Sequence, residues 1–278
     1  MRVSRPISRP LSHSLTHSLG GLGVALNPLQ SLITSLFSAS EQGAFYIPMP
    51  VVLGAQSLFQ DAAGTVPVTA DGDPVGRMLN QSGNGYHAIQ TVSGSRPVYR
   101  TDGVLHWLEF DGVNDYLITS SLGYGNNSKM SWSVGIKRPG SSSTAIAFEF
   151  GPVNSNGGFN LISPRFSVAD YSAQIKGTSS INLNTLQGEY ALGSTNIISV
   201  SAEIPTESAA LRVDGVLKAT GGNMGTGNFN DNVLYLGSRQ GDSLNSNIRI
   251  YGTVFVSKVV DDFSNLESYL ADLAGVNL

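Results

Sequence analysis

Residues 104–119 read VLHWLEFDGVNDYLIT, and this stretch decides the predicted fold. Apolar residues alternate on both sides of an Asp-Gly pair, which predicts two strands joined by a tight turn. Glycine favours such a turn because it accepts positive φ. The positions expected to form the apolar face are Val104, Leu108, Phe110, Leu117 (or Tyr116) and Ile118. We therefore expect this hairpin to open a large antiparallel β domain.

Alternating patterns continue from this hairpin towards the C-terminus. Trp132 alternates with polar neighbours in the run 130–136, and further strand-like runs lie at 145–150, 197–204, 210–214, 233–237 and 248–256. Turns recur every ten to twenty residues without a long helix between them, which predicts a β-sandwich or jelly roll. A short C-terminal helix is predicted from the helical spacing of Phe263, Leu266, Leu270 and Leu273, with Asp261 or Asp262 at its start and Gly275 at its end.

The composition is that of a globular chain with few charges. Of its 278 residues 41% are hydrophobic and 13% are charged, the formal net charge is −4, and there is no cysteine. Disulfides, thiolate metal sites and a cysteine nucleophile are therefore excluded. No run reaches the roughly 18 apolar residues of a membrane span. The only local excess of positive charge is three arginines in residues 1–40, which is too small a basic field to predict nucleic-acid binding.

Residues 5–20 repeat a four-residue pattern, RPIS, RPLS, HSLT and HSLG. Pro6 and Pro10 exclude a regular helix there and favour extended backbone. Because such a segment cannot bury its own leucines, we expect a docking arm onto a partner protein; an unattached tail is the alternative. The expected anchoring residues of the arm are Arg5, Arg9, Leu11, Leu15 and Leu19.

A helix is predicted over residues 27–40. Asn27 suits the N-cap, Pro28 suits the first helical position and Gly43 suits a C-terminal stop. Its apolar stripe consists of Leu29, Leu32, Ile33, Leu36 and Phe37. This stripe either forms an oligomer or attachment contact or packs on the chain's own β domain. The predicted organisation is thus an arm and helix over 1–40, a loop-rich connector over 41–103 that packs on the sandwich, and a sandwich with the C-terminal helix over 104–278, with a start near residue 86 as an alternative.

Several of these stretches resemble known proteins. LEFDGVNDYL (108–117), MSWSVGIK (130–137), LRVDGVLK (211–218) and LYLGS (234–238) resemble the concanavalin A-like (LamG-like jelly-roll) fold. Upstream, SLFSASEQGAFY (35–46), LFQDAAGTVPVT (58–69), DPVGRMLNQSGNGYHAIQ (73–90) and RPVY (96–99) are similar to virion structural proteins of tailed bacteriophages and prophages. Ile47-Pro48-Met49-Pro50 departs from that group, which usually has Asp-Pro-Ser here.

This resemblance implies a mainly β protein: a concanavalin A-like antiparallel β-sandwich with an N-terminal extended arm and helix and a short C-terminal helix. It also implies a location in the virion, with capsid, collar or tail proteins as partners and a homo-oligomeric assembly, for which a trimer is one form. We expect a non-enzymatic fibre, spike, collar or decoration component whose sandwich is exposed for attachment to host-surface glycans. A purely architectural role and a polysaccharide depolymerase are the alternatives.

Candidate sugar-binding residues follow from aromatic, carboxylate and amide side chains on expected surfaces: Trp107, Glu109, Tyr124, Asn126 and Asn127. Glucanases of this fold use an E-x-D-x-x-E strand, but this chain has Asn114 at the last position. Because a retaining mechanism needs two carboxyls, we expect no catalysis. No cofactor is expected; calcium is an alternative, with Asp71, Asp73, Asn84, Asp111 and Asp115 as available ligands, although their spacing matches no known loop.

Overall fold

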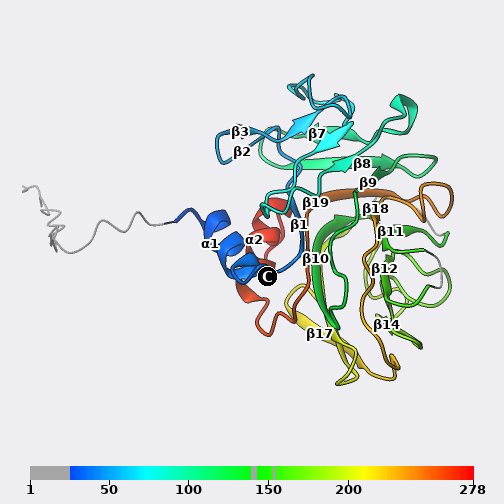
Figure 1. The fold of residues 1–278 in the computed structure, drawn as a ribbon. Helices are drawn as coiled ribbons and strands as arrows, with labels where there is room; N and C mark the ends of the chain where they lie inside the picture. Colours follow the sequence, from blue (N-terminus) through cyan, green and yellow to red (C-terminus); the bar gives the residue numbers. More distant parts are fainter. Residues whose placement is uncertain (1–25, 139–142, 153–154) are drawn as a thin grey trace, which may run out of the picture.

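The computed structural model of this chain describes residues 26–138, 143–152 and 155–278. Within them, two antiparallel sheets stack face to face, and two helices lie on the outer side of the first sheet (Figure 1). The expected mainly β sandwich with an N-terminal and a C-terminal helix is confirmed. Of the described helices, none is both long and apolar enough to cross a membrane.

The first sheet is built around β19, which pairs with β10, β8 and β1. Its strand order is β17-β16-β15-β10-β19-β8-β7, with β1 beside β19. The bounds are β1 Gly43–Tyr46, β7 Val98–Thr101, β8 His106–Asp111, β10 Lys129–Lys137, β15 Thr195–Glu203, β16 Ser208–Val213, β17 Val216–Gly221 and β19 Asn247–Val256.

The second sheet has the order β14-β13-β12-β11-β18-β9-β6-β5-β4. Its bounds are β4 Leu58–Phe59, β5 Arg77–Met78, β6 Ala88–Ile89, β9 Leu117–Ile118, β11 Ile146–Phe150, β12 Gly158–Ile162, β13 Ser172–Lys176, β14 Ser180–Asn184 and β18 Leu234–Leu236. A separate small hairpin joins β2 (Val51–Val52) to β3 (Ala55–Gln56), and a 3-10 turn covers Ser93–Ser95. All of the runs expected as strands after residue 129 form strands, whereas β12, β13 and β14 were not predicted.

The core lies between the two sheets. Trp132 of β10 is buried there, with its ring edge-on to Phe148 of β11 at 4.8 Å between centroids. Phe148 in turn meets Phe255 of β19 edge-on at 4.9 Å. Because these rings come from both sheets, the aromatic cluster holds the two layers together. The predicted inward face of the 130–136 run is confirmed, because Met130, Trp132, Val134 and Ile136 all join this core.

The Asp-Gly turn does not close a hairpin, and that part of the prediction is wrong. β8 belongs to the first sheet and β9 to the second, so the turn carries the chain across the sandwich. Asp111 Oδ1 accepts a hydrogen bond from the Val113 N–H (2.7 Å), and Asp115 Oδ2 accepts one from the Asp111 N–H (3.0 Å). Gly112 has φ +76°, as the tight turn requires. Side-chain bonding by the two aspartates thus replaces the strand ladder at this crossing.

The inward positions of β8 are confirmed for Leu108 and Phe110, which are buried in the core. Val104 was also expected to face inward, but it is 81% exposed. It lies before β8, in a turn where its N–H donates to Asp102 Oδ1 (3.0 Å). The alternation therefore starts two residues later than the apolar pattern indicates.

Residues 41–103 are part of the sandwich rather than a connector packed on it, since β1 and β7 join the first sheet and β4, β5 and β6 join the second. The two stretches SEQG and SGNG meet each other here. The carbonyl oxygen of Gly43 accepts hydrogen bonds from Asn80 Nδ2 (3.3 Å), Ser82 Oγ (3.2 Å) and Asn84 Nδ2 (3.1 Å). These polar residues therefore hold β1 in place next to β19.

The two helices cover the outer face of the first sheet. α1 spans Pro28–Phe37 and α2 spans Ser264–Ala274, and their apolar residues form one cluster with Phe45, Tyr251 and other residues of that face. The predicted N-cap is confirmed: Asn27 Oδ1 accepts from the Leu29 N–H at 2.9 Å. Gly43 is not the C-terminal stop of α1, because Ser38 is the C-cap.

Of the two alternatives for the apolar stripe of α1, the structure shows packing on the chain's own domain. Leu29, Leu32 and Leu36 are buried, and Ile33 and Phe37 pack half-buried against the same cluster. The predicted end of α2 is confirmed at Gly275, which has φ +66°. The predicted arm, with Arg5, Arg9, Leu11, Leu15 and Leu19, lies outside the described residues.

Candidate functional site

Trp107 and Glu109 lie on the outer face of β8, as expected, but both are engaged by neighbours. The Arg249 guanidinium lies 5.1 Å from the centre of the Trp107 ring, and Tyr251 packs beside that ring at 5.8 Å. The Glu109 carboxylate pairs with Arg100 at 3.3 Å and with Arg249 at 2.9 Å. These contacts make Trp107 and Glu109 part of a structural cluster.

The other three predicted sugar-binding residues do not join them. Tyr124 is fully buried in the core against Phe150, with 5.0 Å between ring centroids, so its proposed exposure is wrong. Asn126 is exposed in the loop before β10, and the neighbouring Asn127 side chain donates to the backbone carbonyl of Ser257. The loop composition indicated a polar surface, but the aromatic residue within it serves the core.

The candidate calcium ligands are distributed among separate turns. Asp71 Oδ1 accepts from the Thr101 N–H at 2.9 Å, and Asp73 Oδ2 accepts from the Ala70 N–H at 2.9 Å. Asn84 donates to the Gly43 carbonyl, and Asp111 and Asp115 hold the crossing turn, as described above. In the part of the chain that the structure describes, no three histidine or acidic side chains gather where they could hold a metal ion.

A different set of polar residues converges on the outer face of the second sheet. One side chain from each of five adjacent strands stands in direct cross-strand register, and the row runs Asn182 (β14), Gln174 (β13), Asn160 (β12), Glu149 (β11) and Tyr235 (β18). Each lies between two residues that face the opposite way into the core, because side chains alternate along a strand. We call this row the polar row.

The amides of the polar row bond to one another in one direction. Gln174 Nε2 donates to Asn182 Oδ1 at 3.5 Å, and Asn160 Nδ2 donates to Gln174 Oε1 at 3.1 Å. Among residues 26–138, 143–152 and 155–278, this leaves Asn160 Oδ1 without a hydrogen-bond donor, although Asn160 is only 5% exposed. A buried acceptor without a partner is costly, by about 1–3 kcal/mol, so an external donor would bind there favourably.

Glu149, the next member of the polar row, has the same deficit. Its Oε1 accepts from Arg239 Nε at 3.1 Å, whereas its Oε2 meets no donor from the described residues, and the residue is only 3% exposed. Burial raises the pKa of the Glu149 carboxyl, and the positive charge of Arg239 opposes that rise. Two unpaired oxygens therefore occupy neighbouring positions of the row, on β11 and β12.

Two hollows lie along this face, on either side of Pro152, which lines both. One is a recess of about 10 Å³ lined by Glu149, Asn160 and Gln174, about the space of one water molecule or one hydroxyl group. The other measures about 290 Å³ and is lined by Tyr235 and by Ser121, Asp231, Asn232, Val233 and Gln240. The half-buried Tyr235 ring borders this hollow, and the half-buried Tyr116 ring lies 6.3 Å from it. Recess, hollow and rings together make this face the candidate site.

The polar row was missed by sequence reasoning, although a signal for it exists. Each of its five strands carries an apolar-polar-apolar triplet: FEF at 148–150, FNL at 159–161, AQI at 173–175, INL at 181–183 and LYL at 234–236. Such a triplet predicts a strand with one polar side chain on its outer face. The register that aligns the five polar residues depends on strand pairing, which the triplets alone do not specify.

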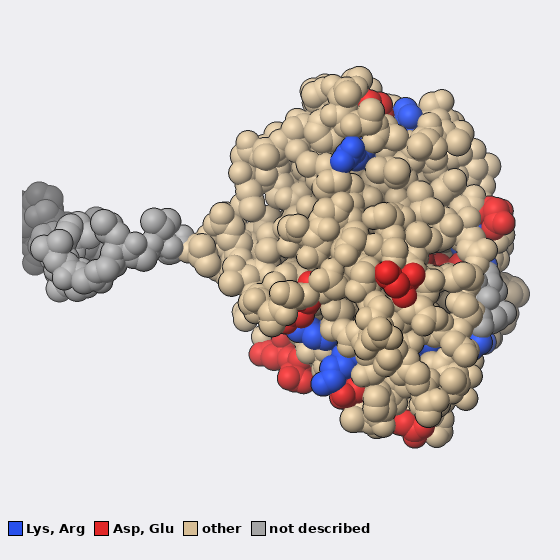
Figure 2. Space-filling model, in the orientation of Figure 1, with Lys and Arg blue, Asp and Glu red and all other residues tan. Residues whose placement is uncertain are grey.

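Charged side chains are sparse on the face seen in Figure 2, and those present are of both signs. Recognition on such a surface depends on hydrogen bonds and ring contacts more than on long-range attraction.

Comparisons with known proteins show the fold alone. No protein-family model matches the chain, and no curated protein matches it. Among solved structures, the chain is similar to the ligand-binding domain of botulinum neurotoxin serotype D in complex with N-acetylneuraminic acid (TM-score 0.55, 11% identity, 86% of this chain and 52% of that one). It is also similar to Trypanosoma rangeli sialidase (TM-score 0.52, 12% identity, 85% of this chain and 33% of that one). The chain thus spans about half and a third of their lengths.

Proposed function

We propose that this domain binds carbohydrate through the outer face of the second sheet, without hydrolysing it. The observation that carries the proposal is a pair of buried acceptors, Asn160 Oδ1 and Glu149 Oε2, that find no donor in the described part of the chain and lie beside a recess that admits one hydroxyl. Sugars are dense in hydroxyl donors, and an unpaired buried acceptor discriminates strongly for a ligand that supplies the missing hydrogen bond.

The geometry of the row favours an extended glycan that lies across the strands. Neighbouring strands are about 4.8 Å apart, so the five positions of the row span about 19 Å. A linear oligosaccharide laid along the row would meet one polar side chain per strand. At its β18 end, Tyr235 and Tyr116 offer aromatic rings on which the apolar face of a sugar ring can stack. The solved botulinum neurotoxin complex, with its bound N-acetylneuraminic acid, supports carbohydrate as the ligand class.

Matched variants on the two sheets test this proposal. Asn160→Leu keeps the size of the side chain and removes the acceptor, whereas Trp107→Ala alters the face that the sequence pattern favoured. We expect the unmodified chain to bind members of a glycan array, Asn160→Leu to weaken calorimetric binding of the best of them at least tenfold, and Trp107→Ala to leave it unchanged. The proposed face would be refuted if the unmodified chain bound no glycan on the array. It would also be refuted if Trp107→Ala weakened binding and Asn160→Leu left it unchanged.

The absence of hydrolysis is part of the proposal. The carboxylate that the glucanase resemblance points to, Glu109, is held between Arg100 and Arg249, which disfavours its action as an acid or nucleophile. The acidic member of the polar row is Glu149, and a glycosidase needs a second carboxyl across the scissile bond. Reducing-end release from the bound glycan is the assay. Release that disappears in Glu149→Gln would establish a hydrolase and overturn this part of the proposal.

We propose further that the domain acts in a phage virion as an attachment component, alone or as part of an oligomer. The support is the sequence resemblance, together with the hydrogen bonds from Ser82 and Asn84 that join its SGNG stretch to its SEQG stretch at Gly43. The packing of α1 sharpens the test: removal of residues 1–25 leaves the helix in place, whereas removal of residues 1–40 takes away α1 and uncovers the apolar cluster on which it packs. We expect the chain lacking 1–25 to fold and to be absent from purified particles. Its normal incorporation would contradict the anchoring role.

A further inference from the structure

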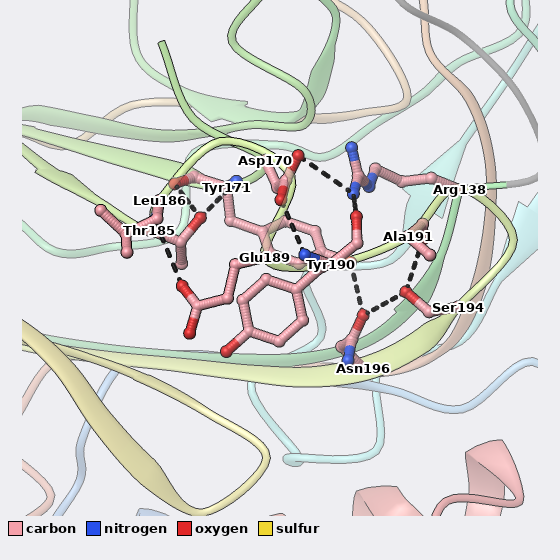
Figure 3. Close-up of polar contacts among 10 residues, drawn as sticks. All are labelled: Arg138, Asp170, Tyr171, Thr185, Leu186, Glu189, Tyr190, Ala191, Ser194 and Asn196. Carbon is pink, nitrogen blue, oxygen red and sulfur yellow. Dashed lines mark hydrogen bonds and ion pairs between the residues drawn. The ribbon is translucent and has the colours of Figure 1, made fainter.

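A second hollow, of about 280 Å³, lies at the edge of the sandwich between two loops, apart from the polar row. One loop covers residues 163–171, which follow β12, and the other covers 185–194, which follow β14; Arg138, directly after β10, lines the hollow with them. Figure 3 shows these segments converging on the Arg138 guanidinium. The hollow shares no lining residue with the recess and hollow of the proposed sugar-binding face.

The two loops are held together through the backbone of Tyr190. Its N–H donates to Asp170 Oδ2 at 2.8 Å, and its carbonyl oxygen accepts from Arg138 Nη2 at 2.8 Å. Arg138 also forms an ion pair with Asp170, with 3.7 Å between Nη2 and Oδ1, and its guanidinium lies 4.8 Å from the centre of the Tyr171 ring (Figure 3). Arg138 is therefore oriented before any ligand arrives, which lowers the entropy cost of binding.

One donor of this oriented arginine has no acceptor within the part of the chain that the structure describes. The Arg138 side chain is only 3% exposed, and its Nε makes no hydrogen bond to any described residue. Arginine normally presents its donors as a fork that matches a carboxylate. Nη2 donates to the Tyr190 carbonyl and pairs with Asp170, so Nε is the donor that stays unpaired among the described residues.

The rest of the hollow carries a second cation and an apolar rim. Two cations, Arg138 and Arg165, line it against one carboxylate, Asp170, so its lining has a net charge of +1. Phe166 and Leu192 also line it, and they are 59% and 55% exposed. They give the hollow an apolar rim above its polar floor, and ligand pockets usually combine apolar walls with a few polar groups.

We propose that this hollow binds a sugar residue that carries a carboxylate, of the uronic acid class. The carboxylate would lie towards Arg138 and Arg165, and the ring would stack on Phe166. The size of the hollow suits a single sugar residue better than a chain. This site shares no residue with the polar row, so binding at one site does not require binding at the other.

Paired probes on the full chain isolate the carboxylate. Methyl glucuronide and methyl glucoside share a ring and differ in that group, and their binding can be followed by NMR titration. We expect the glucuronide to bind at least tenfold more tightly than the glucoside. Phe166→Ala and Arg165→Gln, both on the rim, should weaken glucuronide binding at least fivefold, whereas the exposed Leu217→Ala on β17 should leave it unchanged. Arg138→Lys, which keeps the charge and removes Nε, should weaken it at least as much.

The proposal would be overturned if the glucuronide did not bind at millimolar concentration, or if both probes bound with equal affinity. It would also be overturned if acetate displaced the glucuronide as well as unlabelled glucuronide does, or if the two rim variants kept full affinity for the glucuronide. The rim variants keep the test valid if Arg138→Lys fails to fold. Asn160→Leu separates this site from the polar row. It should retain glucuronide binding, and loss of that binding would place the ligand on the other face.

Discussion

The carboxyl of Asp115 lies in the turn that carries the chain between the two sheets, and it is buried there. Burial, together with the nearby charge of Asp111, raises its pKa from 3.8 to about 6, although the hydrogen bond from the Asp111 N–H opposes the rise. We predict that Asp115→Asn stabilises the protein at neutral pH. The amide is neutral at all pH values and can still accept the Asp111 N–H.

The magnitude follows from the shift of the Asp115 pKa by about two pH units. At about 1.4 kcal/mol per unit, the ionised carboxylate costs the folded state up to about 3 kcal/mol above pH 6. The folded state binds the proton of Asp115 more tightly than the unfolded chain does. The stability that the protonated Asp115 carboxyl gives the folded state is therefore fully present below pH 4 and is lost as the pH rises through 6. The gain in Asp115→Asn should therefore be largest at pH 7.5 and disappear near pH 3.5.

Urea unfolding at several pH values measures this difference. Asp61→Asn is the opposite-sign control: hydrogen bonds from Thr65 and Val66 lower the pKa of the exposed Asp61 carboxyl to about 2, so that variant should lose stability at neutral pH. A pH-independent difference between Asp115→Asn and the unmodified protein would refute a buried, ionised Asp115. Destabilisation at pH 7.5 would refute it as well.

Three further predictions concern the core, a buried ion pair and a helix cap. Trp132→Ala should cost about 3–5 kcal/mol in urea unfolding because it empties the aromatic cluster, while the exposed Leu217→Ala should stay within about 0.5 kcal/mol. Arg212 Nε donates to the buried Glu267 carboxylate at 2.9 Å, so Arg212→Leu leaves that charge unpaired and should lower the free energy of unfolding by about 3 kcal/mol. The double variant Arg212→Leu/Glu267→Leu removes both charges and should regain most of that loss. Asn27→Ala removes a capping box worth about 1 kcal/mol, so amide exchange in α1 should accelerate about fivefold with little change in global unfolding.

Local patterns were sufficient to predict the elements whose periodicity reflects burial. The alternation around Trp132 predicts β10, and the i, i+3, i+4 stripe that includes Leu29 and Leu36 predicts α1, because the apolar residues of each element pack into one cluster. Helix ends with strong chemistry, at Asn27 and Gly275, were also predictable.

Long-range pairing was not predictable from the same patterns. The Asp-Gly turn has the local chemistry of a hairpin, yet β8 and β9 pair with β19 and β18, which follow more than a hundred residues later. The polar row depends on the same kind of information, since Asn160 and Glu149 become neighbours only through the register of β11 and β12. Tyr124 shows the converse: its glycine-rich and asparagine-rich loop looks exposed, but the tertiary fold buries the ring.

The most direct test of the sugar-binding face is an NMR titration that watches both sheets at once. The side-chain amide signals of Asn160, Gln174 and Asn182 report on the polar row, and the indole N–H signal of Trp107 reports on the opposite sheet. On addition of the glycan selected from the array, we predict saturable shifts of the three amide signals and an unmoved Trp107 signal. Shifts of the Trp107 signal without shifts of the amides would contradict the proposed site.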